Sequence, residues 1–203
     1  MSPRRRKAED VDVFAALVRV MQRCGPAELT LREIAAEAGV TAGALVQRFG
    51  SKRELLLAHA RHAAATGDVG FGAPQSERVA SPVRALRGEI AVHAKLARSP
   101  RAALRNLAYF LNDLADPVLR RHLVRLARET RARYERLMAA AAAAGELRGD
   151  TDVRALARMI EVTLGGSFLA WTLHREGSAV EWVSRDLDTL LAPYLARGAH
   201  RSR

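Results

Sequence analysis

Apolar side chains recur every three or four residues along most of this chain, which is the spacing of an amphipathic helix. The first such segment carries its apolar residues at Val11, Phe14, Leu17, Val18 and Met21. Gly25 and Pro26 follow it, and both residue types commonly end helices. The pattern therefore predicts a helix over about 11–21.

The next helix starts are marked by residues that cap a helix N-terminus. Thr30 is followed three positions later by Glu33, which is a capping-box pattern. It predicts a helix over 31–38 that ends at Gly39, a residue suited to the left-handed conformation after a helix. By the same reasoning two more helices follow, one capped by Thr41 and running to about Phe49, the other capped by Ser51 and starting at Lys52.

A stretch rich in Gly, Pro and Ser at about 66–81 predicts a loop. Three later helices start with a cap residue followed by proline, which is favoured at the first helical position. They begin at Ser81-Pro82, Ser99-Pro100 and Asp116-Pro117, and the last of them reaches the alanine run at 139–144. Another helix is expected from Asp150 or Thr151 to about Arg175, and a final one from about Val180 to Ala196. Nine helices are expected in total.

Composition supports an all-α protein with a substantial apolar core. Of the 203 residues 49% are hydrophobic and only 5% are aromatic, and the abundant Ala, Leu and Arg favour helix over strand. Cys24 is the single cysteine, so an internal disulfide is excluded, and we interpret it as a packing residue with a reactive thiol as the alternative. No signal peptide and no run of about 20 apolar residues is present, so we expect a cytoplasmic protein without a membrane partner.

The formal net charge of +11 permits an anionic partner such as nucleic acid. Most of this excess lies beyond residue 65, and a composition biased towards Arg would produce it without any such partner. The charge is therefore compatible with DNA binding and does not identify it.

The segment 30–52 reads TLREIAAEAGVTAGALVQRFGSK and carries the most specific signal. Two short helices joined by a glycine turn must cross at a steep angle, which requires a small residue at the crossing and apolar residues on the facing sides. Ala35 supplies the small contact, and the shared core is expected from Ile34, Ala38, Val40, Leu45 and Phe49. The second helix then presents small residues to a groove, with Gln47 and Arg48 able to contact base edges or phosphates. An ordinary helical hairpin within an all-α core is the alternative.

The segment resembles the signature of the TetR family of bacterial transcriptional regulators. The matching stretches are IAAEAGV, then TAGALVQRF, then GSKRELL, within a resemblance that covers about residues 9–60. The resemblance implies a flexible basic arm at 1–8, a helix-turn-helix DNA-binding domain at 9–65 with its motif at about 30–49, and a helical effector-binding and dimerisation domain at 66–203. It also implies a set of DNA-contacting residues: Thr30, Arg32, Thr41, Ala42, Gly43, Ala44, Gln47, Arg48 and Lys52.

Two positions depart from the family pattern. The family commonly has Tyr where this chain has Val46 and His where it has Arg48. Val46 cannot donate the phosphate hydrogen bond of that Tyr, whereas Arg48 keeps a donor and adds a permanent charge.

In TetR-like proteins the C-terminal region holds the effector pocket and the dimer interface, so residues for both are expected here. The last two helices usually pair with their copies, and the seam is expected from Leu156, Ile160, Leu164, Trp182, Leu187, Leu190 and Leu191. The expected pocket residues are His93, Leu107, Phe110, Leu111, Met159, Thr163, Phe168 and Trp171. Ordinary intramolecular core explains either set as well.

The combined hypothesis is a sequence-specific DNA-binding regulator, a homodimeric repressor that a small-molecule effector releases from its operator. No metal, no cofactor and no enzymatic activity is expected. His59 and His62 have a spacing that can bind metal, but no third ligand of that kind lies near them in the sequence. The alternatives are a TetR-like interaction protein without specific DNA binding, favoured by Val46, and a helical enzyme on the same fold.

Overall fold

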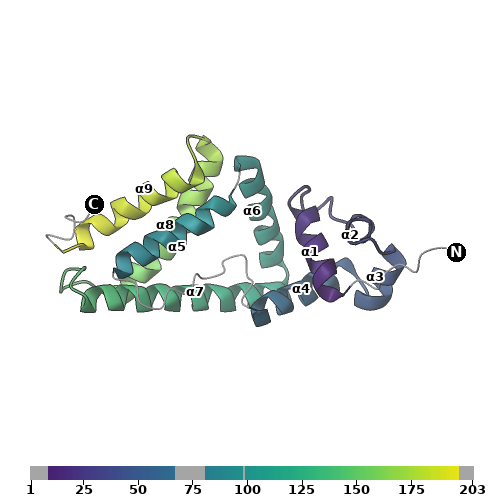
Figure 1. Ribbon diagram of the computed structural model, residues 1–203, viewed down its shortest axis with the longest axis horizontal. Helices are drawn as coiled ribbons and strands as arrows, with labels where there is room; N and C mark the ends of the chain where they lie inside the picture. Colours follow the sequence, from purple (N-terminus) through teal and green to yellow (C-terminus); the bar gives the residue numbers. More distant parts are fainter. Residues whose placement is uncertain (1–8, 67–80, 98, 197–203) are drawn as a thin grey trace. The chain divides into compact units, whose positions relative to one another are not determined.

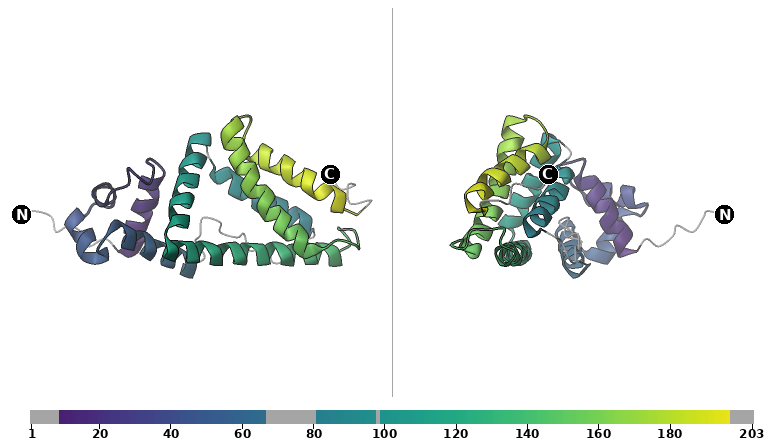
Figure 2. Two further views of the ribbon diagram at one scale, coloured as in Figure 1. Left: turned by 180° about the vertical axis from the view of Figure 1, so that it is seen from behind. Right: turned by 60° about the vertical axis from the view of Figure 1, so that its left-hand side comes forward.

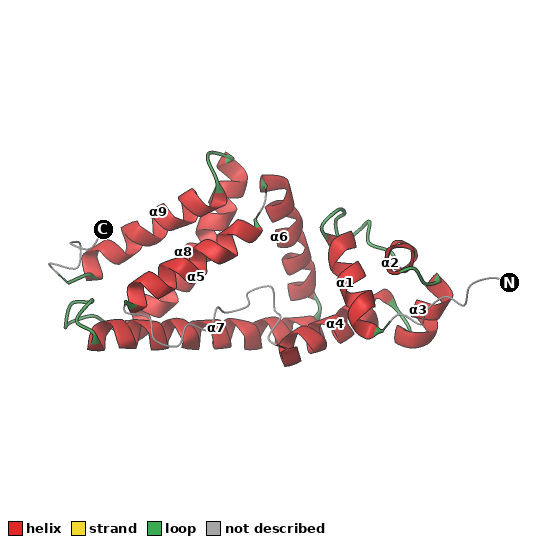
Figure 3. Cartoon of the chain, in the orientation of Figure 1, coloured by secondary structure: helices red, strands yellow, loops and turns green. Residues whose placement is uncertain are grey.

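The computed structural model describes residues 9–66, 81–97 and 99–196, and these form nine α-helices and one short 3₁₀ helix, with no strand (Figures 1 and 3). The helices are α1 (Asp10–Met21), α2 (Leu31–Ala38), α3 (Ala42–Phe49), α4 (Lys52–Thr66), α5 (Pro82–Leu96), α6 (Pro100–Ala115), α7 (Pro117–Ala143), α8 (Val153–His174) and α9 (Ala179–Leu191), followed by η1 (Ala192–Tyr194). The all-α fold class is confirmed, as are most of the predicted helix starts. The predicted arm at 1–8 and most of the predicted loop at 66–81 lie outside the described residues.

The chain divides into two compact units. The first contains residues 1–70 and 104–124, and therefore α1 to α4, most of α6 and the start of α7. Its apolar core is formed mainly by α1. Further side chains come from Leu29, which precedes α2, and from α2, α3, α4 and α6. The buried residues of this core are Val13, Phe14, Leu17, Val20, Leu29, Ile34, Ala35, Leu45, Leu55 and Tyr109.

The second unit contains residues 71–103 and 125–203. Within it α9 packs against both α5 and α8, and the views of Figure 2 show α8 and α9 running side by side. The core residues come from α5, α7, α8 and α9, and include Leu86, Ile90, Met138, Leu156, Ile160, Leu187 and Leu191. This unit is a helical bundle of its own.

Two helix boundaries of the second unit were predicted wrongly. The helix expected from Asp150 or Thr151 is capped instead by Asp152, whose carboxylate accepts hydrogen bonds from the backbone N–H groups of Arg154 and Ala155, each at 3.0 Å. The carboxylate of Asp150 is bound instead to the Arg148 guanidinium, at 3.0 Å.

The final helix ends at Leu191 rather than at Ala196. Pro193 has no backbone N–H and disfavours the α conformation of the residue before it, so the α-helix gives way to the 3₁₀ turn η1. Leu195 is then extended and pairs with Leu147 in an isolated antiparallel bridge. The backbone N–H of Arg148 donates to Tyr194 O at 2.8 Å and that of Ala196 to Glu146 O at 2.9 Å. The bridge fastens residues 194–196 to the α7–α8 connection.

Candidate nucleic-acid interface

Helices α2 and α3 form a helix-turn-helix whose turn is fixed by local hydrogen bonds. The Thr30 hydroxyl accepts a hydrogen bond from Glu33 N at 3.2 Å, and the Glu33 carboxylate accepts one from Thr30 N at 3.1 Å. This is the predicted capping box. Gly39 ends α2 in the left-handed conformation with φ 69°, and Val40 N donates to Ala35 O at 3.0 Å. Because L-residues with a Cβ are strained at this φ, glycine is the residue that permits so tight a turn.

The two helices are held in place by the apolar core of the first unit. Ile34, Ala35 and Leu45 are buried, and Ala38, Val40 and Phe49 pack against them, as the sequence predicted. On the surface the Glu37 carboxylate of α2 bridges Arg19 of α1 and Arg23 in the turn after α1, with both N–O distances 2.6 Å. Hydrogen bonds from these two guanidinium groups lower the pKa of Glu37, and the one from Arg19 has the larger effect. The bridge ties α1 to α2 along their exposed edge.

Helix α3 is short and capped at its N-terminus, and its outward face is lined mostly by small residues. The Thr41 hydroxyl accepts a hydrogen bond from Ala44 N at 3.1 Å and caps the helix. Gly43, Ala44 and Gln47 are exposed, whereas Ala42 is half-buried against the core. A Cβ added at Gly43 would meet only the Thr41 hydroxyl oxygen, at 4.0 Å. The N-terminal half of α3 therefore offers a close approach of its backbone and its positive dipole end to a polyanion.

Of three further residues predicted to contact DNA, Thr30 and Lys52 bind other groups of the chain, and Arg32 is exposed. The hydroxyl of Thr30 both accepts from and donates to Glu33. Lys52 is half-buried, and its Nζ donates to Leu29 O at 2.9 Å and to Pro26 O at 3.3 Å. Two of the three ammonium donors thus close the loop before α2, which leaves one for a phosphate. Arg32 is exposed at the start of α2.

Arg48, another predicted contact residue, also has partners within the chain. Its guanidinium forms an ion pair with the carboxylate of Asp10, the first residue of α1. It also lies over the Phe49 ring, 5.5 Å from the centroid. Nothing in the spacing of Asp10 and Arg48 along the sequence indicated this pairing.

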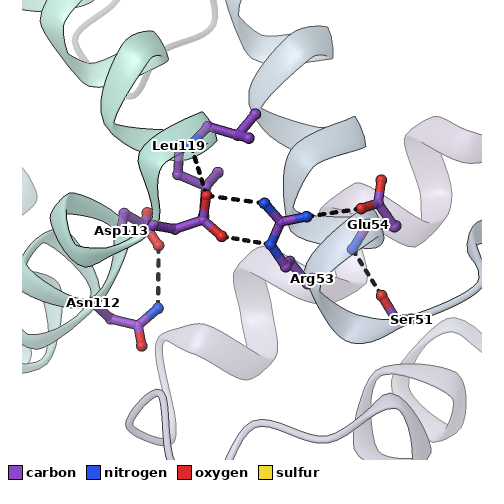
Figure 4. Close-up of polar contacts among 8 residues, drawn as sticks. Ser51, Arg53, Glu54, Asn112, Asp113 and Leu119 are labelled. Atoms are coloured by element: carbon purple, nitrogen blue, oxygen red, sulfur yellow. Dashed lines mark hydrogen bonds and ion pairs between the residues drawn. The ribbon is translucent and has the colours of Figure 1, made fainter.

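A second long-range ion pair lies within the same unit, between α4 and the start of α7 (Figure 4). Arg53 Nε and Nη2 donate to the two carboxylate oxygens of Asp116, at 2.5 and 3.1 Å. Asp116 Oδ1 also accepts from the backbone N–H groups of Val118 and Leu119, at 2.8 and 3.2 Å. The hydrogen bond from Arg53 is the main reason why the pKa of Asp116 falls to about 2. Sequence reasoning found Asp116 as a cap and missed its partner, which lies 63 residues away.

The residues predicted to line an effector pocket are spread over both units. Trp171 is buried, and its indole N–H donates to Gly177 O at 3.2 Å, so it closes the α8–α9 turn. His93 is buried, and Thr163 and Phe168 are half-buried. Phe110, Leu111 and Met159 are exposed, and Leu107 is half-buried. The pocket stays a prediction for all eight.

Four of the seven residues predicted for the dimer seam lie inside the chain's own core. Leu156, Ile160, Leu187 and Leu191 are buried within the core of the second unit, where the chain's own side chains surround them. Leu164, Trp182 and Leu190 are half-buried. The sequence pattern identified the apolar face of each helix correctly and could not show that this face turns inward.

None of the helices among the described residues is long and apolar enough to cross a membrane. The same residues contain no group of three or more His, Cys, Asp or Glu side chains that could hold a metal ion. His59 and His62 lie against the Phe14 ring, with ring centroids 5.5 and 5.1 Å away.

Comparison with protein families identifies the chain. Residues 13–59 match the family described as bacterial regulatory proteins of the tetR family, and residues 112–187 match the tetracyclin repressor-like C-terminal domain. The chain belongs to the TetR family. It is a DNA-binding transcriptional regulator, with α2 and α3 as the helix-turn-helix of the family. No curated protein sequence matches this chain.

Solved structures of regulators have the same fold as this TetR-family chain. SmeT, the repressor of the Stenotrophomonas maltophilia multidrug efflux pump SmeDEF, is 24% identical, with 95% of this chain and 93% of SmeT covered and a TM-score of 0.69. A protein from Saccharomonospora viridis in complex with choline is 16% identical, with 93% and 98% covered and a TM-score of 0.75. FadR from Bacillus subtilis in complex with stearoyl-CoA is 18% identical, with 91% and 98% covered and a TM-score of 0.67.

Proposed function

We propose that this TetR-family regulator is a homodimeric repressor which a small-molecule effector releases from a two-fold-symmetric operator. The observation that carries the proposal is the outward face of α3, where Gly43, Ala44 and Gln47 are exposed at the end of a helix pair fixed by its own caps and core. In a helix-turn-helix the second helix lies in the major groove and its partner crosses the backbone. Two such helices, one per subunit, would read half-sites about 34–36 Å apart or a multiple of that.

Within the α3 face, base reading is assigned to Gln47 and backbone contacts to its neighbours. Gln47 is exposed and central on the face, and a Gln amide can form a bidentate hydrogen-bond pair with adenine in the major groove. Thr30, Arg32, Thr41, Arg48 and the remaining Lys52 donor are assigned to phosphates, which position the protein without reading sequence.

The experiment that tests this is selection of bound sequences from a random duplex library, with the wild type, Gln47→Ala and Arg48→Ala. The expected result is a two-fold-symmetric motif that Gln47→Ala blurs at one base pair per half-site. Arg48→Ala is expected to weaken binding without changing the motif. Steeply salt-dependent binding with no enriched motif would replace this proposal with the interaction-protein alternative.

For the dimer, α8 offers an exposed apolar stripe in place of the buried positions. Ala155, Met159, Val162, Gly166, Leu169 and Leu173 are all exposed. They are spaced alternately by four and three residues, which is the spacing of a helix seam that packs against another helix. Leu173 is 76% and Val162 58% exposed, so burying them against a second copy would remove considerable apolar surface from water. Gly165 and Gly166 have no neighbour within 4 Å of an added Cβ, so a partner helix could approach closely there.

The dimer is tested by charge substitution on the stripe. Val162→Glu and Leu169→Glu are expected to convert the dimer into a monomer, measured by light scattering coupled to gel filtration. Val92→Glu on α5 is the matched control, because Val92 is an exposed apolar residue outside the stripe. Dimers that survive both stripe substitutions would contradict this interface.

For the effector, the second unit holds a charged pair, with a buried carboxylate and a half-buried guanidinium, that is suited to a polar group. Glu89 of α5 is buried and forms an ion pair with Arg133 of α7. Burial is the main reason why the pKa of Glu89 is raised. Arg133 Nε is also buried and has no hydrogen-bond partner among the described residues. A buried donor without an acceptor costs free energy, which an acceptor atom on a bound effector would recover.

Three solved structures with this fold differ in their bound compound. SmeT is in complex with triclosan, the S. viridis protein with choline and FadR with stearoyl-CoA. These three compounds therefore make a chemically varied first set of probes. Binding of any of them is expected to raise the melting temperature of the wild type and to release DNA. Glu89→Gln is expected to reduce the shift while retaining the fold. Release of DNA by a compound whose binding is insensitive to Glu89→Gln would place the effector elsewhere.

A further inference from the structure

The position of Arg48 on α3 separates it from the centre of the exposed face. Successive residues of an α-helix are rotated by about 100°, so Gly43 and Gln47 point the same way, opposite to the buried Leu45 and the half-buried Phe49. Arg48 lies one residue beyond Gln47, on the flank of the helix. Val46 occupies the other flank and is 49% exposed. A residue on this flank is placed for the DNA backbone beside the groove rather than for the base edges within it.

On that flank Asp10 and Phe49 of the same unit are among the groups that contact Arg48. The Asp10 carboxylate pairs with its guanidinium, and the Phe49 ring lies beneath it at 5.5 Å. The pair is open to solvent, since the side chains of Arg48 and Asp10 are 35% and 53% exposed. A phosphate could therefore replace the Asp10 carboxylate as an ion-pair partner of Arg48. The guanidinium would exchange one oxyanion for another, and Asp10 would be left as an unpaired negative charge close to DNA.

We infer that Asp10 competes with DNA phosphate for Arg48 and thereby lowers the affinity of this regulator for DNA of any sequence. The inference rests on the proposed function, in which α3 enters the major groove. Phosphate contacts position a protein without carrying sequence information, so the competition sets overall affinity and leaves sequence preference unchanged. Asp10 acts through Arg48 and makes no contact with DNA itself.

The test is a double-mutant cycle in the full-length protein with a scrambled-sequence duplex as the probe. Asp10→Asn keeps the size of the side chain and removes its charge. It is expected to bind the duplex about two- to fivefold more tightly at moderate salt, the range set by the small energy of an exposed ion pair. The slope of log K against log salt is expected to steepen by up to about 0.9, the increment of one further phosphate contact.

The matched control is Asp10→Asn in an Arg48→Ala background, where the removed charge remains but its partner is absent. The gain is expected to disappear there, and the motif selected from the random library is expected to stay the same. Equal gains in both backgrounds would show a long-range charge effect and overturn the inference. No gain, or weaker binding by Asp10→Asn, would overturn it too, since the pair would then serve only to hold α3 against α1. A wild type that fails to bind the scrambled duplex at low salt would refute the proposed function itself.

Discussion

Asp116 binds Arg53 across 63 residues of sequence and caps α7 with the same carboxylate. Arg53 is in the first turn of α4, the helix that follows the helix-turn-helix. Both carboxylate oxygens are used, because Oδ2 accepts from Arg53 Nε while Oδ1 accepts from Arg53 Nη2 and from two backbone N–H groups. One residue thus fixes the start of α7 and joins it to α4 within the first unit.

The two roles of Asp116 are separable by substitution. Asp116→Asn keeps a capping oxygen and loses the ion pair, whereas Asp116→Ala loses both. Loss of a helix cap destabilises the helix, so Asp116→Ala is expected to be the less stable variant. Urea unfolding followed by circular dichroism measures the difference. Equal stability of the two variants would contradict the capping role.

The ion pair also makes stability depend on pH in a defined window. The pKa of Asp116 falls from 3.8 to about 2 in the folded protein, chiefly because of the hydrogen bond from Arg53. A pKa lowered by folding contributes stability that is complete above the unfolded value and is lost as the pH falls through the folded value. The stability difference between wild type and Asp116→Asn is therefore expected to be constant above about pH 5 and to shrink between pH 4 and pH 2. A difference that persists unchanged to pH 2 would argue against this assignment.

Leu45 and Val46 are neighbours on α3 with opposite environments. Leu45 is 1% exposed and packs in the core of the first unit, whereas Val46 is 49% exposed. Leu45→Ala is expected to destabilise the protein by about 2–5 kcal/mol, the usual cost of such a cavity. Val46→Ala is expected to change stability by less than about 0.5 kcal/mol. Chemical denaturation of both variants checks the contrast, and similar losses would mean that α3 is packed by a different face.

Gly39 and Gly88 are expected to respond to alanine with opposite signs. Gly39 has φ 69° at the turn between α2 and α3, a conformation that costs an L-residue about 1–2 kcal/mol. Gly88 lies inside α5, where an added Cβ meets nothing within 4 Å. Gly88→Ala is therefore expected to stabilise the protein by about 0.5–1 kcal/mol. Thermal unfolding of the two variants measures both, and a Gly39→Ala variant as stable as wild type would show that the turn can adopt another conformation.

Local signals in the sequence were sufficient for most of the helix boundaries. Thr30 with Glu33, Thr41, and the Ser-Pro and Asp-Pro pairs act within one turn of the chain, so the residues that decide each helix start are neighbours in sequence. The boundary errors were at Asp152, where three polar residues compete for the cap, and at Pro193, where a proline inside an apolar pattern ended the α-helix.

The exposed residues of the candidate DNA-binding face could be predicted from the sequence, but the hydrogen bonds and ion pairs of that face could not. Small exposed residues before Gln47 follow from the helical period, given that Leu45 and Phe49 face the core. The partners of Arg48 and Lys52 did not follow, because Asp10, Pro26 and Leu29 belong to segments that only folding brings near.

The sequence by itself determined the helices, the helix-turn-helix and the family, since caps, turns and apolar periodicity act over a few residues. The tertiary structure decided which apolar face of α8 is buried and which arginines form ion pairs with which carboxylates. Leu156 and Leu169 are equally apolar in sequence, but the core of the second unit buries the first and leaves the second exposed. Such distinctions depend on contacts between segments distant along the chain, and the pattern along one helix carries no information about which neighbour will cover it.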